Sequence, residues 1–526
     1  MRGILLALLL AAGPAFAAPY DVVEKDIATL QADLAAHRIT SAELVRLYEQ
    51  RIAALDGAGP HLGSVLILNP DALAEARALD AERAVKGARG PLHGIPILVK
   101  DNIETADPMP TTAGSLALAG NITHRDAPVV ARLRAAGAII LGKTNLSEWA
   151  NIRSTHSISG WSGIGGLTHN PYVLDRSTCG SSAGSGAAVA ASLAAAALGT
   201  ETNGSLVCPG SFNGIVALKP TVGLVSRTHV IPISHTQDTA GPMTRTVADA
   251  ALLLDVMAGS DPEDAATASA DAKRRPYAAA LVKGALAGKR LGVVIPPGVT
   301  PTDKLFAGAL AILRAAGAEI VQVPDFTGPA DMMANQAIVL NFELKNDMAA
   351  YLATLPPGGP KSLADLIAFN AASPRELALF GQERFEVADT TGTLSDPAYL
   401  KAHDLLGAGT RGLLDSTFTA YRLDALIRPT AEPAFRVDTA RGDNIGGSAA
   451  GVPAMAGYPH LTVPMGAVDG LPVGLSFIGP AWSESLLLAL GADFERHAAA
   501  RRPPQFLPSL ESPTTAALAP VKSSGH

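Results

Sequence analysis

The chain has 526 residues, of which 48% are hydrophobic and 17% charged, and its formal net charge is −7. This length suits one very large α/β domain or a few smaller domains, with ample apolar material for a buried core. The mild negative charge argues against nucleic acid, or an anionic membrane surface, as the main partner.

The first residues have the pattern of a secretory signal peptide. Arg2 supplies the positive start, residues 4–12 the apolar run, and Ala15 and Ala17 the small residues of a cleavage site. The run is too short for a membrane span, which needs about 20 residues. We therefore expect removal of residues 1–17, cleavage after Ala17, a periplasmic or secreted protein, and no membrane attachment afterwards. A retained membrane anchor is the alternative.

After the signal, helical and extended patterns alternate. Thr40 and Glu43 form a capping-box pattern that begins a helix. Further helices are predicted at 71–86, 129–136, 247–258 and 485–498, and strands at 64–68, 91–103, 138–143, 214–219, 289–295, 423–429, 460–465 and 472–478. The Ala-rich stretch after residue 182 predicts a buried helix. This alternation, without a clear linker, indicates one layered α/β domain with helices on both faces of a sheet.

Three segments depart from this alternation. Residues 153–186 form a long Gly/Ser/Asn-rich loop, and a loop of that length in a compact domain is usually functional. Residues 330–420 are predicted to be mainly helical. Residues 501–526 are rich in Pro, Ser and Thr and predict a mobile tail. We expect residues 153–172 and 330–420 to shape a pocket. Trp161 and Phe369 are candidates for that lining, with core packing as the alternative.

Cys179 and Cys208 are the only cysteines, which excludes a disulfide-rich scaffold. They can pair in an oxidising compartment or remain as buried free thiols, and the sequence leaves both states open. Without a nearby pair of histidines they make a poor zinc site. No metal or cofactor is predicted.

A serine nucleophile needs a base, and none of the histidines near the Ser-rich segments follows a nucleophile-elbow pattern. A lysine can act as the base if burial in an apolar setting keeps it neutral. Lys100 meets this condition, because it ends the apolar run 95–99 and precedes Asp101 and Asn102. A solvated surface charge is the alternative for a single lysine at a strand end.

Four ordered motifs resemble the amidase signature family: GIPILVKDN at 94–102, CGSSAGS at 179–185, GTETNGS at 199–205 and VALKPTVGLVSR at 216–227. The resemblance covers residues 18–500 and implies a single domain with a mixed, twisted sheet. By motif position, Lys100 resembles the family's base, Ser181 its cis-serine and Ser205 its nucleophile. The resemblance implies a cis peptide bond before Ser181 and an acyl-enzyme on Ser205.

The turn before Ser205 is predicted to form the oxyanion hole through the backbone N–H groups of Thr202, Asn203 and Gly204. Ser182 and Thr200 are candidates for orienting the triad, with ordinary turn hydroxyls as the alternative. Cys179 stands where the family usually has glycine, and Asn203 where a small residue or Asp is common. These two departures flank the predicted site.

Further segments, including 143–151, 157–162, 206–209 and 362–370, are similar to a bacterial branch that includes peptide amidase. That resemblance implies hydrolysis of the C-terminal amide of peptides, with release of ammonia. An amidase for small aliphatic or aryl carboxamides is the alternative. A non-catalytic binding protein on the same fold is a further alternative, and the intact Lys100, Ser181 and Ser205 argue against it. We expect a monomer.

Overall fold

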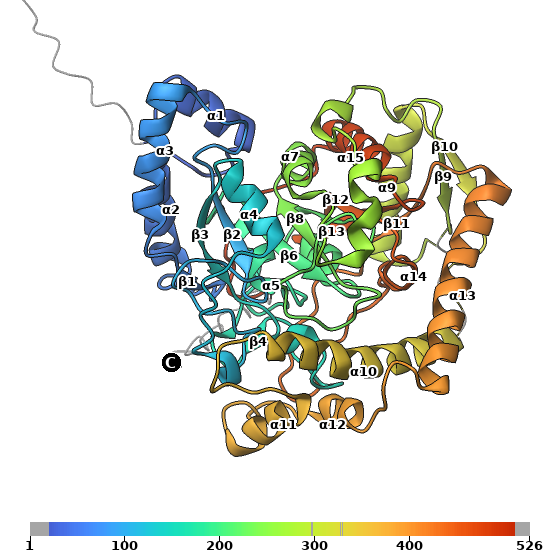
Figure 1. Cartoon of the computed structure of the whole chain (residues 1–526). Helices are drawn as coiled ribbons and strands as arrows, with labels where there is room; N and C mark the ends of the chain where they lie inside the picture. Colours follow the sequence, from blue (N-terminus) through green and yellow to red (C-terminus); the bar gives the residue numbers. More distant parts are fainter. Residues whose placement is uncertain (1–19, 296–297, 327, 329, 511–526) are drawn as a thin grey trace, which may run out of the picture.

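A computed structural model describes residues 20–295, 298–326, 328 and 330–510 of the chain. The predicted signal peptide, residues 1–17, lies outside this part. Within it, an eleven-stranded sheet has the order β1-β3-β2-β6-β8-β7-β12-β13-β11-β9-β10, and a small sheet pairs β4 (Trp161–Ser162) with β5 (Gly166–Leu167) (Figure 1). The large sheet contains both parallel and antiparallel pairs, which confirms the mixed α/β fold.

The strands of the first half lie at one side of the sheet. They are β1 (Val65–Leu68), β2 (Pro96–Lys100), β3 (Ile139–Thr144), β6 (Ala196–Glu201), β7 (Val216–Lys219) and β8 (Thr239–Thr244). The second half adds β9 (Arg290–Val293), β10 (Glu319–Gln322), β11 (Ala425–Pro429), β12 (His460–Val468) and β13 (Leu471–Ile478). β2 pairs in parallel with both β3 and β6, and all five of its residues are buried. Lys100 therefore ends an interior strand whose residues are all buried.

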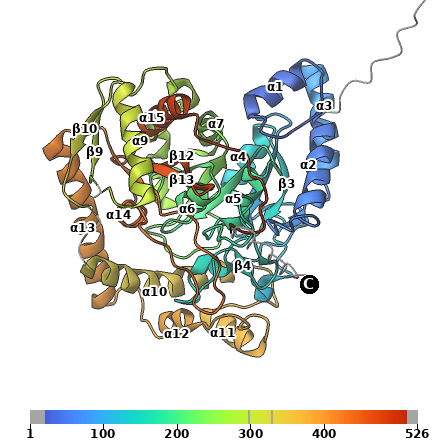
Figure 2. The same cartoon turned by 180° about the vertical axis from the view of Figure 1, so that it is seen from behind.

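Helices pack on the sheet in two groups. α5 (Ala183–Ala190) and α6 (Val207–Phe212) contact each other and the middle strands. α4 (Pro128–Ala135), α7 (Val247–Met257), α15 (Glu484–Ala498) and α9 (Pro301–Ala315) form a second continuous group (Figure 2). α1 (Ile27–Ala35), α2 (Ser41–Leu55) and α3 (Ala72–Lys86) flank the β1 side, and α2 begins with the predicted Thr40–Glu43 capping box.

The region from 330 to 420 is helical, as predicted. It contains α10 (Ala330–Ala353), α11 (Leu363–Ala372), α12 (Glu383–Asp389) and α13 (Pro397–Tyr421). α10 packs on α12 and α13, and in both views it crosses the lower part of the molecule just above α11 and α12 (Figures 1 and 2). The remaining helices are α8 (Ala270–Lys273) and α14 (Gly451–Ala456), with short 3-10 turns at 116–118, 148–151, 265–269 and 278–280. In the described part of the chain, none of the helices has the length and apolar character that a membrane crossing requires.

The Ala-rich stretch is not one helix, which corrects the sequence prediction. α5 ends at Ala190, Ser192 takes a left-handed φ of 56°, and residues 196–201 form β6 between β2 and β8. Alanine favours a helix in isolation, but placement inside a sheet overrides that preference. Gly199 allows close packing here, because an added Cβ would lie 2.7 Å from the Oγ of Ser182.

The segment predicted as a mobile tail joins the fold at its start. Arg501 forms an ion pair with Glu24, and the N–H groups of Phe506 and Leu507 donate to the carbonyls of residues 171 and 172. The predicted boundary at residue 501 is therefore too early. Residues 511–526 lie outside the described part of the chain.

Candidate active site

The Nζ of Lys100 lies 2.7 Å from the Oγ of Ser181 and 2.8 Å from the Oγ1 of Thr200, with the carbonyl oxygen of Thr200 at 3.4 Å. Lys100 and Ser181 are fully buried and Thr200 is 7% exposed. A neutral amine has two N–H donors and one lone pair. The two Thr200 oxygens can accept both N–H groups, which turns the lone pair toward the hydroxyl of Ser181.

Burial lowers the pKa of Lys100 to about 7, although the negative charges of Asp238 and Glu201 oppose this shift. A large fraction of Lys100 is then neutral near neutral pH. A buried amine that contacts a hydroxyl and is not held as a cation has the chemistry of a general base.

Two other lysines, Lys143 and Lys219, are also fully buried, and burial lowers the pKa of each to about 8. Lys143 donates to the carbonyl of Ile103 and the hydroxyl of Thr111, and Lys219 donates to the carbonyls of Pro220 and Tyr458. Among these three buried amines, Lys100 is the one that contacts a serine hydroxyl. This contact singles it out as the candidate base.

Ser181 and Ser205 lie on neighbouring turns. Ser181 follows a cis peptide bond after Gly180, as the family resemblance implied, and precedes α5. Ser205 lies between β6 and α6 and is 8% exposed. The N–H of Ser182 donates to the carbonyl oxygen of Ser205 at 3.2 Å, so the two turns are in direct contact.

Cys179 and Cys208 form a disulfide, which resolves the question that the sequence left open. The bond joins the residue before Gly180 to the first turn of α6, three residues after Ser205. It therefore ties together the two turns that carry the candidate serines. The family's usual glycine at position 179 could not make this link.

The predicted oxyanion turn combines free backbone donors with side chains that hold it in place. Gly204 has a left-handed φ of 84°, which suits glycine. In the described part of the chain, the N–H groups of Thr202, Asn203 and Gly204 donate to no other protein group. The hydroxyl of Thr202 donates to Asp238 at 2.5 Å. Free N–H groups at a fixed turn can stabilise a developing oxyanion.

Ser182 and Thr200, the two residues predicted to orient the triad, bond to each other. The Oγ of Ser182 donates to the carbonyl of Thr200 at 3.0 Å and accepts the Thr200 N–H at 3.2 Å. Thr200 also contacts Lys100 directly through two oxygens, a contact that the sequence did not predict. These bonds link the Ser181 turn, β6 and Lys100 into one unit.

Sequence reasoning missed several residues that reach this unit. The amide of Asn102 donates to the Oγ1 of Thr200 at 3.0 Å. Asp238 is buried, which raises the pKa of its carboxyl to about 6, although it accepts bonds from Ser234, Thr202 and Ile233. The carboxylate of Glu201 accepts the N–H groups of Leu206 and Val207 at the start of α6. Asn102 lies in the motif at 94–102 and Glu201 in the motif at 199–205, so their positions in the sequence could have marked them as candidate site residues.

A cavity of only about 10 Å³ lies beside Asn102 and is lined further by Ala113, Trp149–Ala150 and Ile231–Ile233. The two aromatic residues proposed from sequence lie elsewhere. Trp161 is buried against Phe380, with ring centroids 5.2 Å apart, and Phe369 is 39% exposed. Neither residue lines this cavity.

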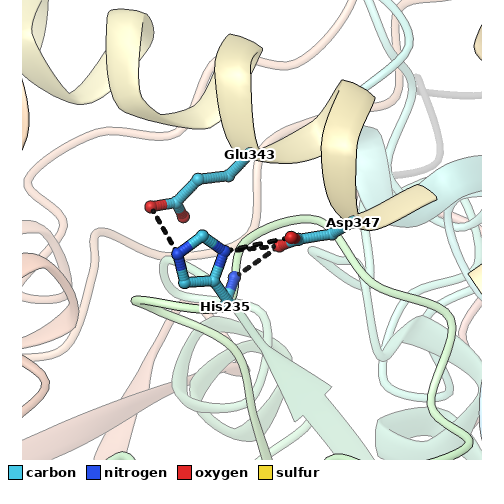
Figure 3. A group of neighbouring side chains, drawn as sticks. All are labelled: His235, Glu343 and Asp347. Carbon is cyan, nitrogen blue, oxygen red and sulfur yellow. Dashed lines mark hydrogen bonds and ion pairs between the residues drawn. The ribbon is translucent and has the colours of Figure 1, made fainter. Parts of the chain in front are cut away.

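One further cluster has the residue types of a metal site: His235, Glu343 and Asp347, whose ligand atoms lie within 4.8 Å of one another (Figure 3). These atoms already bond to protein groups. The Nδ1 of His235 lies 2.9 Å from Asp347, and Glu343 accepts the hydroxyls of Ser234, Thr236 and Tyr399. The cluster therefore joins the loop at 234–236 to α10.

Comparisons with known proteins identify the family of the chain. The sequence model of the Amidase family matches residues 43–488. A probable amidase of Arabidopsis thaliana is 38% identical over 521 residues, covering 95% of this chain and 96% of that protein. A glutamyl-tRNA(Gln) amidotransferase subunit of Renibacterium salmoninarum is 36% identical, covering 90% of this chain and 94% of its own length.

Among solved structures, the native peptide amidase from Stenotrophomonas maltophilia is 50% identical, covers 93% of this chain and 100% of its own, and superposes with a TM-score of 0.88. A peptide amidase in complex with the competitive inhibitor chymostatin is also 50% identical, covers 92% of this chain and 99% of its own, and has a TM-score of 0.87. The chain therefore belongs to the amidase signature family and is an amidase, a hydrolase that acts on carbon–nitrogen bonds.

Proposed function

We propose that this amidase is exported, hydrolyses the C-terminal amide of peptides and releases ammonia. The observation that carries the chemistry is the buried contact between Lys100 and Ser181, beside the turn of Ser205. The substrate class is supported by the similarity, over nearly the whole chain, to the Stenotrophomonas peptide amidase.

In the proposed reaction, neutral Lys100 takes the proton of the Ser181 hydroxyl, and Ser181 takes the proton of Ser205. The Oγ of Ser205 then attacks the amide carbonyl carbon. The proton returns along the same path to the leaving nitrogen, which departs as ammonia and leaves an ester on Ser205. Water adds to this acyl-enzyme by the same route, the Ser205 oxygen leaves, and the peptide acid is released.

Negative charge on the carbonyl oxygen rises during both additions. The free N–H groups of Thr202, Asn203 and Gly204 are the proposed donors to it, and the hydroxyl of Thr202 holds the turn through its bond to Asp238. Loss of one such donor typically costs about 3–4 kcal/mol in the barrier. Thr200 and Ser182 keep the lone pair of Lys100 aimed at Ser181.

Two observations support the proposed export. Residues 1–17 have the pattern of a signal peptide, and the Cys179–Cys208 disulfide suits an oxidising compartment. The test is the intact mass of the protein recovered from the periplasm or medium of a bacterial host. We expect a chain that begins at Ala18. A chain that retains residues 1–17 would contradict cleavage.

The substrate is tested by measuring ammonia release from acetyl-leucyl-phenylalaninamide, acetamide and benzamide. We expect kcat/KM to be highest for the peptide amide. Faster release from acetamide or benzamide would favour the small-carboxamide alternative. An absence of ammonia from every amide would instead support a non-catalytic binding protein on this fold. A matched Ser205→Ala variant gives the background rate.

A further inference from the structure

Hydrogen bonds join three side-chain amides, those of Gln237, Gln336 and Asn203, to the oxyanion turn in a closed ring. The Nε2 of Gln237 donates to the carbonyl oxygen of Thr202 at 3.1 Å. The Oε1 of Gln237 accepts from the Nε2 of Gln336 at 3.3 Å, and the Oε1 of Gln336 accepts from the Nδ2 of Asn203 at 3.2 Å. Because Thr202 and Asn203 are adjacent, these bonds form a ring. Gln237 is fully buried and Gln336 is 4% exposed.

The direction of every bond in this ring follows from one backbone group. The carbonyl oxygen of Thr202 can only accept, so Gln237 must present its NH₂ group to it. The oxygen of Gln237 then faces Gln336, which must donate, and the oxygen of Gln336 must accept from Asn203. No amide in the ring can be turned over without placing two oxygens against each other.

The ring also sets the direction of the proposed oxyanion donor. In a trans peptide unit the C=O and the following N–H point to opposite sides of the chain. By holding the carbonyl of Thr202 on one side, Gln237 holds the N–H of Asn203 on the other. That N–H bonds to no protein group among the described residues, which leaves it available to a substrate.

α10 and the loop at 234–238 brace the ring. Gln336, Glu343 and Asp347 lie at intervals of seven and four residues, so they share one face of α10. Asp347 bonds to His235 of the loop (Figure 3). Glu343 accepts the hydroxyls of Ser234 and Thr236 of the same loop. The same loop carries Gln237 and Asp238, which hold both the carbonyl and the hydroxyl of Thr202.

We propose that Gln336 and Gln237 are positioning residues for the oxyanion turn and that Asn203, the departure from the family pattern, completes their ring. The inference rests on the proposed function, because it assigns the Asn203 N–H to the carbonyl oxygen of the substrate. The two glutamines touch no reacting atom. They act by fixing the peptide plane between Thr202 and Asn203.

The test uses Gln336→Met and Gln237→Met, which keep the side-chain volume similar and remove the amide. We expect kcat for acetyl-leucyl-phenylalaninamide to fall at least about tenfold, with KM changed less than about threefold, because misplacing a catalytic group by 1 Å costs about 100-fold. Asn203→Ala keeps the bond from Gln237 to the Thr202 carbonyl and the bond from Gln336 to Gln237. It should therefore lose less activity than either glutamine variant.

Gln31→Met is the matched control. Gln31 also donates to a backbone carbonyl, that of His93, and accepts from Arg83, but it lies on α1. Its removal tests the general cost of losing an amide, so kcat should stay within about twofold of the wild-type value. A kcat of Gln336→Met and Gln237→Met within the same twofold range would overturn the inference.

A second readout separates the turn from overall stability. Acetyl-leucyl-phenylalaninal can add to Ser205 and place an oxyanion at the turn, whereas acetyl-leucyl-phenylalaninol cannot. We expect the glutamine variants to weaken inhibition by the aldehyde by the same factor as kcat, and to leave inhibition by the alcohol unchanged. Equal weakening of both inhibitors would indicate a merely structural role.

Asn203→Asp covers the case in which the core variants fail to fold, because position 203 is partly exposed. A carboxylate there faces the oxygen of Gln336, so kcat and aldehyde inhibition should again fall about tenfold or more. Unchanged values would contradict the ring.

The two inhibitors also distinguish failure of this inference from failure of the proposed function. Suppose that the wild type releases no ammonia but still binds the aldehyde more tightly than the alcohol, and that the glutamine variants lose this preference. The ring then stands and the proposed function fails. If the wild type releases no ammonia and binds the aldehyde and the alcohol equally, both proposals fail.

Discussion

Lys100 carries the acid–base part of the proposed mechanism. Its contacts suit it to this role, because two oxygens of Thr200 accept its N–H groups and the hydroxyl of Ser181 faces its lone pair. Lys143 and Lys219 are as deeply buried but bond mainly to carbonyls. A buried lysine is therefore insufficient by itself, and the contact with a hydroxyl distinguishes the base.

Substitution of the triad tests these roles directly. Ser205→Ala removes the nucleophile and should abolish turnover. Lys100→Met should lower kcat by at least about 10³-fold, since general base catalysis contributes 10²–10⁴-fold. Lys100→Arg should be as inactive, because arginine does not lose its proton in proteins. Steady-state kinetics and circular dichroism of each variant provide the check; near-normal activity in Lys100→Met would refute the relay.

The pH dependence follows from the pKa of Lys100, which burial lowers to about 7. The neutral amine is the active form, so kcat/KM should be low at acidic pH and rise as pH increases through about 7. Asp238 faces the same site with a pKa raised to about 6, and Glu201 is also near. A pH–rate profile that stays low until above pH 9 would mean that Lys100 keeps its ordinary pKa of about 10.4.

At the scale of elements, two turns and the strand between them form the site. The sequence predicted most helices and strands because their apolar periodicity and caps are local signals, as at Thr40 and Glu43. It failed at residues 196–201, where alanine favours a helix but the neighbours β2 and β8 impose a strand. The residues of a single segment do not indicate which distant strands it will lie between in the sheet.

The disulfide makes a testable contribution at this scale. Cys179 and Cys208 are 29 residues apart and connect the Ser181 turn to α6. The double variant Cys179→Ala/Cys208→Ala should lower the free energy of unfolding by about 2–4 kcal/mol, the typical contribution of a disulfide. Urea denaturation of both proteins gives the comparison. Equal unfolding free energies would show that the link does not stabilise the domain.

At the scale of the whole molecule, the large mixed sheet brings together residues that are far apart in the chain. The motifs predicted Lys100, Ser181, Ser205, Ser182 and Thr200, and the structure places Lys100, Ser181 and Thr200 within hydrogen-bonding distance. Gln336 could not be found this way, because it lies 133 residues from its partner Asn203 and in a helix without a family motif. Contacts of such range depend on the complete fold.

The central claim is that the enzyme hydrolyses the C-terminal amide of peptides and spares their internal bonds. Mass spectrometry of a peptide-amide library incubated in oxygen-18 water tests it most directly. We predict peptides of unchanged length in which the terminal NH₂ is replaced by an OH group that carries one labelled oxygen, and no such product with Ser205→Ala. Shortened peptides, or unlabelled and unchanged amides, would contradict the account.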